Sequence, residues 1–180
     1  MQLEQKHWIP VLAILGLLIA AMVVYKGLSD NGPPKLNFKN NLRAQDSLRS
    51  QFMPVINGND SLRVRSFPNK IVILDFWAAY AVSFSPKEHR QLAQLKHAYP
   101  DDVAILAADV EDKPQAAKKY IRRHNYPFHY VDGTKLFNRF QISRIPTQLV
   151  FLPGGHLQSI FTGTADSTRM DSLRAIVKKY

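Results

Sequence analysis

The sequence contains no cysteine among its 180 residues. Thiol–disulfide exchange requires a thiolate that attacks a disulfide sulfur. The chain therefore cannot perform this reaction with its own side chains, and no disulfide can stabilise it. The absence does not indicate a redox compartment, because it removes the residue whose use would report one.

Other residues that commonly carry chemistry are sparse or scattered. The chain has eight glycines, and the pair Gly154-Gly155 lies in a turn pattern and not in a phosphate-binding loop. Ser83 has no identifiable base beside it in the sequence, and Glu111 and Asp112 read as solvated loop charges. The six histidines lack the spacing of metal ligands: His7, His89, His97, His124, His129 and His156. The sequence thus predicts no metal site and no cofactor.

Acidic residues are outnumbered, with 14 Asp and Glu against 24 Lys and Arg, for a formal net charge of +10. The densest basic runs, Lys118-Lys119 with Arg122-Arg123 and Lys178-Lys179, fall on helical patterns. We interpret them as solvated helix faces, with an anionic membrane surface or an acidic partner as the alternative. Nucleic-acid binding is not expected.

An apolar stretch without charge, residues 8–25, lies between Lys6 and Lys26. Its length suits a bilayer, and Trp8 and Tyr25 stand at its ends, as interface aromatics do. A cleaved signal peptide is the alternative, but its apolar region is usually shorter. The stretch therefore predicts a transmembrane helix.

The rest of the chain divides around this span. Residues 1–7 are a short tail, residues 26–50 are predicted to be a linker, and residues 51–180 are predicted to form one domain. Within the linker, residues 36–49 are polar with few apolar positions, which allows a short helix or an arm.

The domain is organised around residues 71–88. An apolar, β-branched run at 71–76 predicts a buried strand, and an aromatic turn at 77–84 follows it. Ser85, Pro86 and Glu88 then mark a helix start. Further strands are expected at 103–108, 128–131, 147–152 and 157–162, further helices at 113–124, 136–140 and 166–179, and a hairpin at 52–64 with its turn at Asn57-Gly58.

Two segments resemble a known family. Asp75-Phe-Trp-Ala-Ala-Tyr-Ala-Val-Ser-Phe84 resembles the thioredoxin active-site segment, a strand ending in D-F-W-A-x-W-C-x-x-C. Arg144-Ile-Pro-Thr-Gln-Leu-Val-Phe151 resembles the loop that carries the cis-proline of that family, here Pro146. On this pattern Tyr80 takes the place of the second tryptophan, and Ala81 and Phe84 take the places of the two cysteines.

The resemblance implies a thioredoxin-like α/β fold, a mixed central sheet flanked by helices. The most similar relatives are membrane-anchored proteins of the TlpA/ResA type, which implies a single-pass protein of the bacterial cytoplasmic membrane with its domain outside the cytoplasm. The local charges favour the reverse orientation, because Lys26, Lys35, Lys39 and Arg43 follow the span. We follow the resemblance.

The resemblance also defines candidate site residues. Asp75 matches a buried acid that serves a cysteine in the family, so here it is a relic or structural acid, with a working acid as the alternative. The predicted binding surface comprises Trp77, Tyr80, Ala81, Phe84, Ile145 and Pro146. Trp77 and Phe84 can equally be core residues. The backbone at Arg144 and Ile145 can pair with an extended chain, or the proline can simply shape the turn.

These observations favour a membrane-tethered, redox-inactive module that binds a protein or peptide partner in the former active-site groove. The alternative is an accessory factor in disulfide or cytochrome c maturation that acts with a cysteine-bearing partner. An enzyme of another class, using Asp75 or a histidine, is a third reading.

Overall fold

The computed structural model describes residues 16, 42–80, 85–111, 114–163 and 167–180. The predicted tail and transmembrane helix lie outside these residues except for Gly16, and so do Ala81 and Phe84. Within the part of the chain that is described, no helix is long and apolar enough to cross a membrane.

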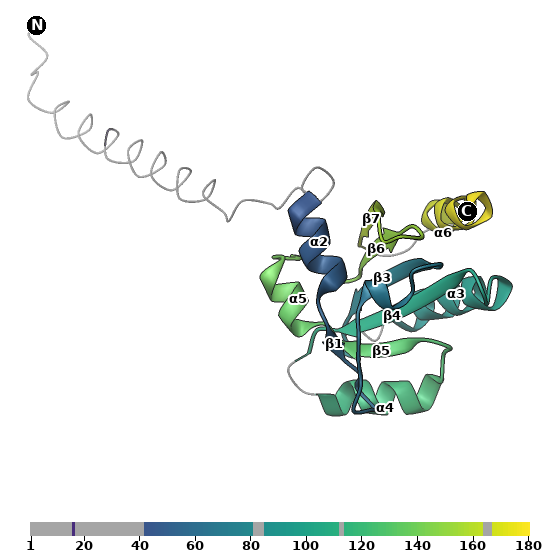
Figure 1. Cartoon of the computed structure of the whole chain (residues 1–180). Coiled ribbons are helices and arrows are strands. Elements are labelled where there is room, and N and C mark those ends of the chain that lie inside the picture. Colours follow the sequence, from purple (N-terminus) through teal and green to yellow (C-terminus); the bar gives the residue numbers. More distant parts are fainter. Residues whose placement is uncertain (1–15, 17–41, 81–84, 112–113, 164–166) are drawn as a thin grey trace, which may run out of the picture. The chain divides into compact units, whose positions relative to one another are not determined.

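The described residues build a five-stranded sheet in the order β5-β4-β3-β6-β7 (Figure 1). Its strands are β3 (Ile71–Trp77), β4 (Val103–Asp109), β5 (His129–Asp132), β6 (Thr147–Phe151) and β7 (Leu157–Thr162). β4 pairs in parallel with β3 and β5, whereas β6 pairs antiparallel with β3 and β7. Every residue of β3 and of β4 is buried, as the continuous apolar runs predict for strands covered on both faces.

Helices cover both faces of the sheet (Figure 1). They are α2 (Leu42–Ser50), α3 (Ser85–Ala98), α4 (Pro114–His124), α5 (Thr134–Arg139) and α6 (Ser167–Lys179), with a short 3-10 turn η3 (Val64–Ser66). Alternate residues of β3 separate the two layers. Ile73 packs in one cluster with Leu92 of α3 and Leu173 of α6, whereas Leu74 packs in another with Leu136 of α5. The predicted mixed sheet with helices on both faces is confirmed.

The predicted hairpin forms, but its turn differs from the expected one. β1 (Met53–Pro54) and β2 (Ser61–Leu62) pair antiparallel over two residues each. Among the described residues, positive φ angles do not occur at Asn57 or Gly58. The loop is longer than a two-residue turn, since the Val55 N–H bonds the Asp60 carbonyl at 2.9 Å, and it therefore needs no positive φ.

The hairpin also covers the edge of the sheet. Val55 forms an antiparallel bridge with Val131 of β5, and the Ile56 N–H donates to the Tyr130 carbonyl at 3.0 Å. An edge strand covered in this way offers less open backbone to other chains.

The end of the predicted linker belongs to the folded body. Leu48 and Ala44 of α2 are 1% and 8% exposed, and both pack in the cluster that contains Leu74. The linker prediction for residues 26–50 is therefore corrected for 42–50, because two apolar side chains one helical turn apart suffice to bury this short helix.

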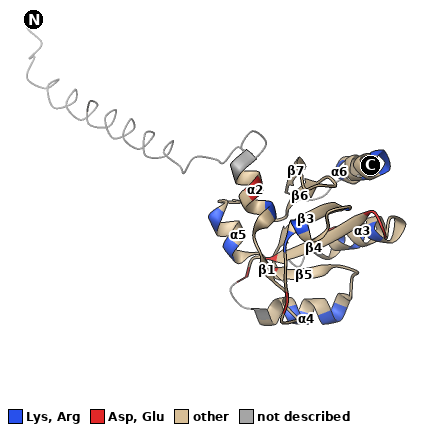
Figure 2. Cartoon of the chain, in the orientation of Figure 1, with Lys and Arg blue, Asp and Glu red and all other residues tan. Residues whose placement is uncertain are grey.

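The basic runs lie on helices, as predicted. Lys119, Arg122 and Arg123 of α4 are exposed, and so are Lys178 and Lys179 of α6. Figure 2 shows Lys and Arg residues along both helices. Their interpretation as solvated faces, or as a surface for an acidic partner, stays a prediction.

Candidate functional site

The candidate site lies where β3 ends and β6 begins. Phe76 pairs with Thr147 across the two antiparallel strands. The segment that follows Trp77 and the segment Ile145-Pro146 therefore leave the sheet at the same edge. The peptide bond between Ile145 and Pro146 is cis, as the resemblance implied. Pro146 is buried and Ile145 is half-buried.

Among the described residues at this end of the sheet, Tyr80 is an exposed aromatic residue. Its side chain is 73% exposed, although its backbone is held in place because the Tyr80 N–H donates to Glu111 Oε1 at 2.7 Å. Glu111, expected to be a solvated loop charge, thus ties the segment after β3 to the segment after β4. A large aromatic side chain on a fixed backbone is a typical anchor for a protein partner.

Trp77 is not part of the surface. It is 1% exposed and packs against the rings of His89, Tyr120 and Tyr130, with centroid distances of 4.8, 4.7 and 6.0 Å. Its assignment to the binding surface is therefore corrected, and the alternative core reading holds. Ala81 and Phe84 lie outside the described residues.

The backbone before Pro146 is already engaged in part. The Thr147 hydroxyl donates to the Arg144 carbonyl at 2.7 Å. The Arg144 carbonyl oxygen has a second lone pair. A strand added by a partner could therefore donate to this carbonyl at the same time as Thr147.

Asp75 belongs to a buried polar chain that the sequence did not reveal. Its Oδ2 lies 3.0 Å from His89 Nε2, and His89 Nδ1 lies 2.9 Å from the Tyr120 hydroxyl. Burial raises the pKa of Tyr120, with smaller contributions from Tyr126, Tyr130 and Asp75, so this hydroxyl keeps its proton. It can donate to Nδ1, which leaves Nε2–H to donate to Asp75.

Aromatic rings close this chain off from water. His89 is 0% exposed, and its ring contacts Phe128 and Tyr130 in addition to Trp77 and Tyr120, at centroid distances of 5.3 and 6.3 Å for the first two. Asp75 is also 0% exposed. A general acid or base must reach the group on which it acts. The arrangement therefore favours the structural reading of Asp75 over the working acid.

A signal for His89 was present in the helix periodicity. Leu92 and Leu95 mark the buried face of α3, and His89 lies three residues before Leu92 on that same face. Glu88 is buried beside it, at 2% exposed, and its Oε1 lies 3.5 Å from Arg169 Nη1 of α6. Glu88 thus links two helices, a role that the capping prediction did not include.

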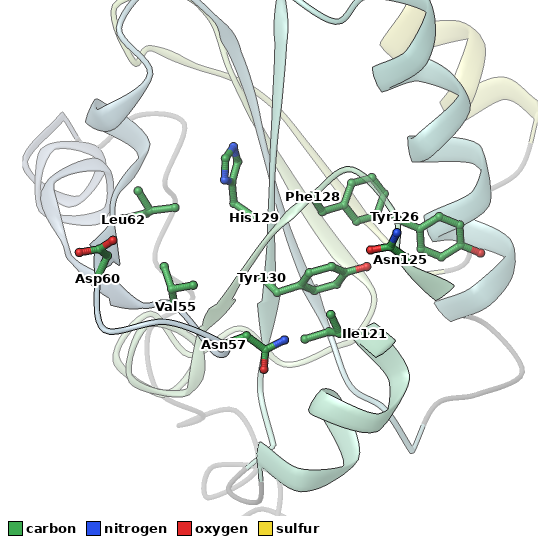
Figure 3. Close-up of a pocket in the computed structure, with 10 residues that line it drawn as sticks. All are labelled: Val55, Asn57, Asp60, Leu62, Ile121, Asn125, Tyr126, Phe128, His129 and Tyr130. Atoms are coloured by element: carbon green, nitrogen blue, oxygen red, sulfur yellow. The ribbon is translucent and has the colours of Figure 1, made fainter. Parts of the chain in front are cut away.

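A cavity of about 460 Å³ lies between the hairpin, the end of α4 and β5 (Figure 3). Tyr126, Phe128 and Tyr130 form its aromatic wall, and Asn57 and Asn125 add amide groups. The Tyr130 hydroxyl is buried without a hydrogen-bond partner among the described residues. Sequence reasoning did not predict this cavity, because its walls come from three separate segments.

Comparisons with known proteins agree with the observed fold. A family model described as thioredoxin-like matches residues 69–157. No curated protein sequence matches the chain. A secreted Mycobacterium tuberculosis disulfide oxidoreductase, described as homologous to E. coli DsbE, is similar in structure with a TM-score of 0.62. It is 17% identical over 75% of this chain and 99% of its own.

Two further structures give the same picture. A putative thiol:disulfide interchange protein DsbE from Chlorobium tepidum has a TM-score of 0.63 and 16% identity over 72% of this chain and 91% of its own. StoA from Bacillus subtilis has a TM-score of 0.56 and 21% identity over 69% and 95%. At these identities the likeness establishes the fold.

Proposed function

Because this chain is a thioredoxin-like protein without a single cysteine, we propose that it is a redox-inactive module that binds a partner polypeptide on its former active-site face. The carrying observation is Tyr80, which is 73% exposed at the edge where β3 and β6 meet, on a backbone fixed by Glu111. A side chain left so exposed gains buried apolar area when a partner covers it.

The proposed contact surface comprises Tyr80, Ala81, Phe84, Ile145 and Pro146. Trp77, the last residue of β3, is buried and packs in the core with Tyr120 and Tyr130, so it supports this surface without being part of it. The replacement of both cysteine positions by Ala81 and Phe84 exchanges reactive groups for apolar ones. Such a change removes chemistry and keeps area for contact.

We also propose that residues 8–25 tether the module to the bacterial cytoplasmic membrane, with the folded body outside the cytoplasm. The apolar composition of this stretch supports the tether. The extracytoplasmic side rests on the TlpA/ResA resemblance, against the local charge bias.

The proposal is tested by quantitative recovery of partners from cells. Tagged full-length chains are purified in parallel as wild type, Tyr80→Ala and Tyr180→Ala, and co-purifying proteins are measured by mass spectrometry. Tyr180 is the matched control, because it is a second exposed tyrosine, 59% exposed, at the far end of the sequence. Removal of a central aromatic anchor commonly costs 2 kcal/mol or more, about thirtyfold in affinity.

We expect at least one protein to fall about tenfold or more with Tyr80→Ala and to be unchanged with Tyr180→Ala. An Asp75→Asn chain that remains folded should retain the same partner, because Asp75 lies inside the core. Equal recovery with both tyrosine variants would contradict the proposal.

A second candidate is an accessory role in disulfide or cytochrome c maturation, with catalysis supplied by a cysteine-bearing partner. The observation that favours it is the shared fold with proteins that are named as disulfide oxidoreductases. Deletion should then lower the level of a disulfide-bonded protein or a c-type cytochrome. Normal levels of both would exclude it.

A further inference from the structure

A second cavity, of about 370 Å³, lies at the carboxyl ends of two parallel strands. Asp109 is the last residue of β4, Asp132 is the last residue of β5, and both line it. In α/β sheets, ligands commonly bind at the carboxyl ends of the strands. The volume is at the small end of the range for ligand sites, so it suits a small molecule.

Two polar atoms of residues that line this cavity are buried without a hydrogen-bond partner among the described residues. The Asp109 carboxylate is also engaged in part, because it accepts hydrogen bonds from the backbone of Val110 and Glu111. Asp109 is 3% exposed, and its Oδ1 has no hydrogen bond to any described residue. The hydroxyl of Thr134, which also lines the cavity, likewise has no hydrogen-bond partner among the described residues. Buried polar atoms normally have partners, and unsatisfied ones call for an explanation such as a ligand. A bound donor would satisfy Asp109 Oδ1.

Charges of both signs line the cavity. Glu111 adds a third carboxylate to Asp109 and Asp132, whereas Lys118 of α4 and Lys135 of α5 are basic. No ion pair within 4.0 Å joins either lysine to these carboxylates among the described residues. Nor do any three described histidine or acidic side chains form a group that could hold a metal ion. The lining therefore suits a ligand that itself carries both charges.

The remaining wall is apolar. Pro54, Val55 and Ile56 of the hairpin segment also line the cavity and contribute apolar side chains. An apolar side chain on the ligand can pack there and gain the free energy of burial.

We propose that this cavity binds a small zwitterion of the amino-acid type. Its ammonium group donates to Asp109 Oδ1 and is attracted by Glu111 and Asp132. Its carboxylate is attracted by Lys118 and Lys135, and its apolar side chain packs on Pro54 and Ile56. This site adjoins the partner surface, because Glu111 lines the cavity and also accepts the Tyr80 N–H. The proposal does not require that surface to bind a polypeptide.

Three probes of similar shape separate the two charges. L-leucine carries both, L-leucinamide carries only the ammonium group, and 4-methylpentanoate carries only the carboxylate. Binding of each to the full-length chain in detergent is measured by calorimetry at about pH 7.5, above the Asp109 pKa of about 7, so that this carboxylate is ionised. We expect L-leucine to bind about tenfold more tightly than either single-charge probe, because charge-assisted hydrogen bonds discriminate by at least that factor.

Two variants assign the charges. Asp109→Asn should weaken L-leucine and L-leucinamide about tenfold and leave 4-methylpentanoate unchanged. Lys135→Gln should weaken L-leucine and 4-methylpentanoate and leave L-leucinamide unchanged. Asp101→Asn and Lys178→Gln are controls at exposed positions outside the cavity and should have no effect. Asp132→Asn replaces Asp109→Asn if that chain does not melt cooperatively, because Asp132 also lines the cavity.

Two results would overturn the proposal. One is the absence of saturable binding of L-leucine up to about 10 mM, since a weaker complex corresponds to no specific site. The other is equal affinity for L-leucine and L-leucinamide, or for L-leucine and 4-methylpentanoate, because one of the two charges would then have no partner.

Discussion

At the scale of single residues, the most informative feature is the set of buried side chains that surrounds Asp75. A carboxylate on an apolar strand needs a partner to remain stable. Here the partner is His89 at 3.0 Å, and Tyr120 completes the chain at 2.9 Å from the other ring nitrogen. Three polar side chains from β3, α3 and α4 thus bond to one another inside the core, and Asp75 Oδ1 is left without a hydrogen-bond partner among the described residues. Asp75 is therefore a structural connection between elements.

Removal of the Tyr120 hydroxyl should destabilise the fold. Tyr120→Phe retains the ring that packs against Trp77 and leaves His89 Nδ1 without its donor. We expect the free energy of unfolding to fall by about 1–2 kcal/mol, measured by urea denaturation. Tyr126→Phe is the matched control, since the bond that the Tyr126 hydroxyl makes within the described residues is a long one, 3.4 Å to the Pro86 carbonyl. Equal losses in both variants would show that the buried chain contributes nothing specific.

Asp109 should make the stability depend on pH. Burial raises the pKa of Asp109 from 3.8 to about 7, and the Glu111 carboxylate adds to the shift, with a smaller contribution from Asp132. The folded chain thus keeps this proton up to about pH 7, whereas the unfolded chain loses it near its ordinary pKa. The folded state binds more protons between these values, so stability from this group falls as pH rises from about 4 to 7 and stays low above it.

Asp109→Asn removes this dependence because the amide does not titrate. Relative to wild type, the variant should gain about 1–2 kcal/mol in free energy of unfolding between about pH 4 and pH 8, less than full linkage because water screens part of the effect. Lys118 and Lys135 line the same cavity and act in both chains. The measurement is urea denaturation at about pH 4 and at about pH 8, with Asp101→Asn as an exposed control. A gain that is the same at both pH values would contradict the assignment.

At the scale of secondary-structure elements, α2 is the element of the folded body that the sequence predicts least clearly. Leu48 should behave as a core residue, since it is 1% exposed and packs in the cluster with Leu74 and Leu136. Leu48→Ala is expected to lower the free energy of unfolding by about 2–4 kcal/mol in urea denaturation. Ser50→Ala in the last turn of the same helix serves as control and should stay within about 0.5 kcal/mol of wild type. If Leu48→Ala also stayed within that range, α2 would be an arm and not part of the core.

The elements that periodicity marks strongly could be predicted, and those that depend on distant contacts could not. β3, β4 and β6 read directly from apolar runs, because buried parallel and central strands need no alternation. α2 has few apolar residues, so only the sheet that receives Leu48 and Ala44 makes it part of the body. The prediction of a tight turn at Asn57-Gly58 was wrong for a related reason, since the path of the hairpin is set by the pairing of Val55 with Val131.

The same distinction applies to the candidate site. The edge formed by Tyr80 and Ile145-Pro146 follows from two segments that the sequence marks clearly. The Asp75–His89–Tyr120 chain joins residues 14 and 31 positions apart, and no local pattern pairs them. Both cavities have walls from separate segments, so neither could be found before the fold was known.

At the scale of the whole molecule, the chain keeps a fold used for redox chemistry and has no thiol with which to perform it. This absence also provides a clean test of membrane orientation, because a single introduced cysteine is the only thiol in the chain. Asp101→Cys places it at an exposed position between α3 and β4. In intact spheroplasts, an impermeant maleimide should label this cysteine without detergent if the body lies outside the cytoplasm. Labelling only after lysis would place the body inside, as the charge bias favours.

The most direct test of the central claim is photo-crosslinking in cells from a photoreactive residue in place of Tyr80, with one in place of Lys119 as control. Both positions are exposed, and Lys119 lies on the basic face of α4. The account predicts a discrete adduct to one polypeptide from position 80 that is missing from position 119. An adduct from position 119 alone would move the contact to the basic helix, and no adduct at position 80 would contradict the claim that the former active-site face binds a partner.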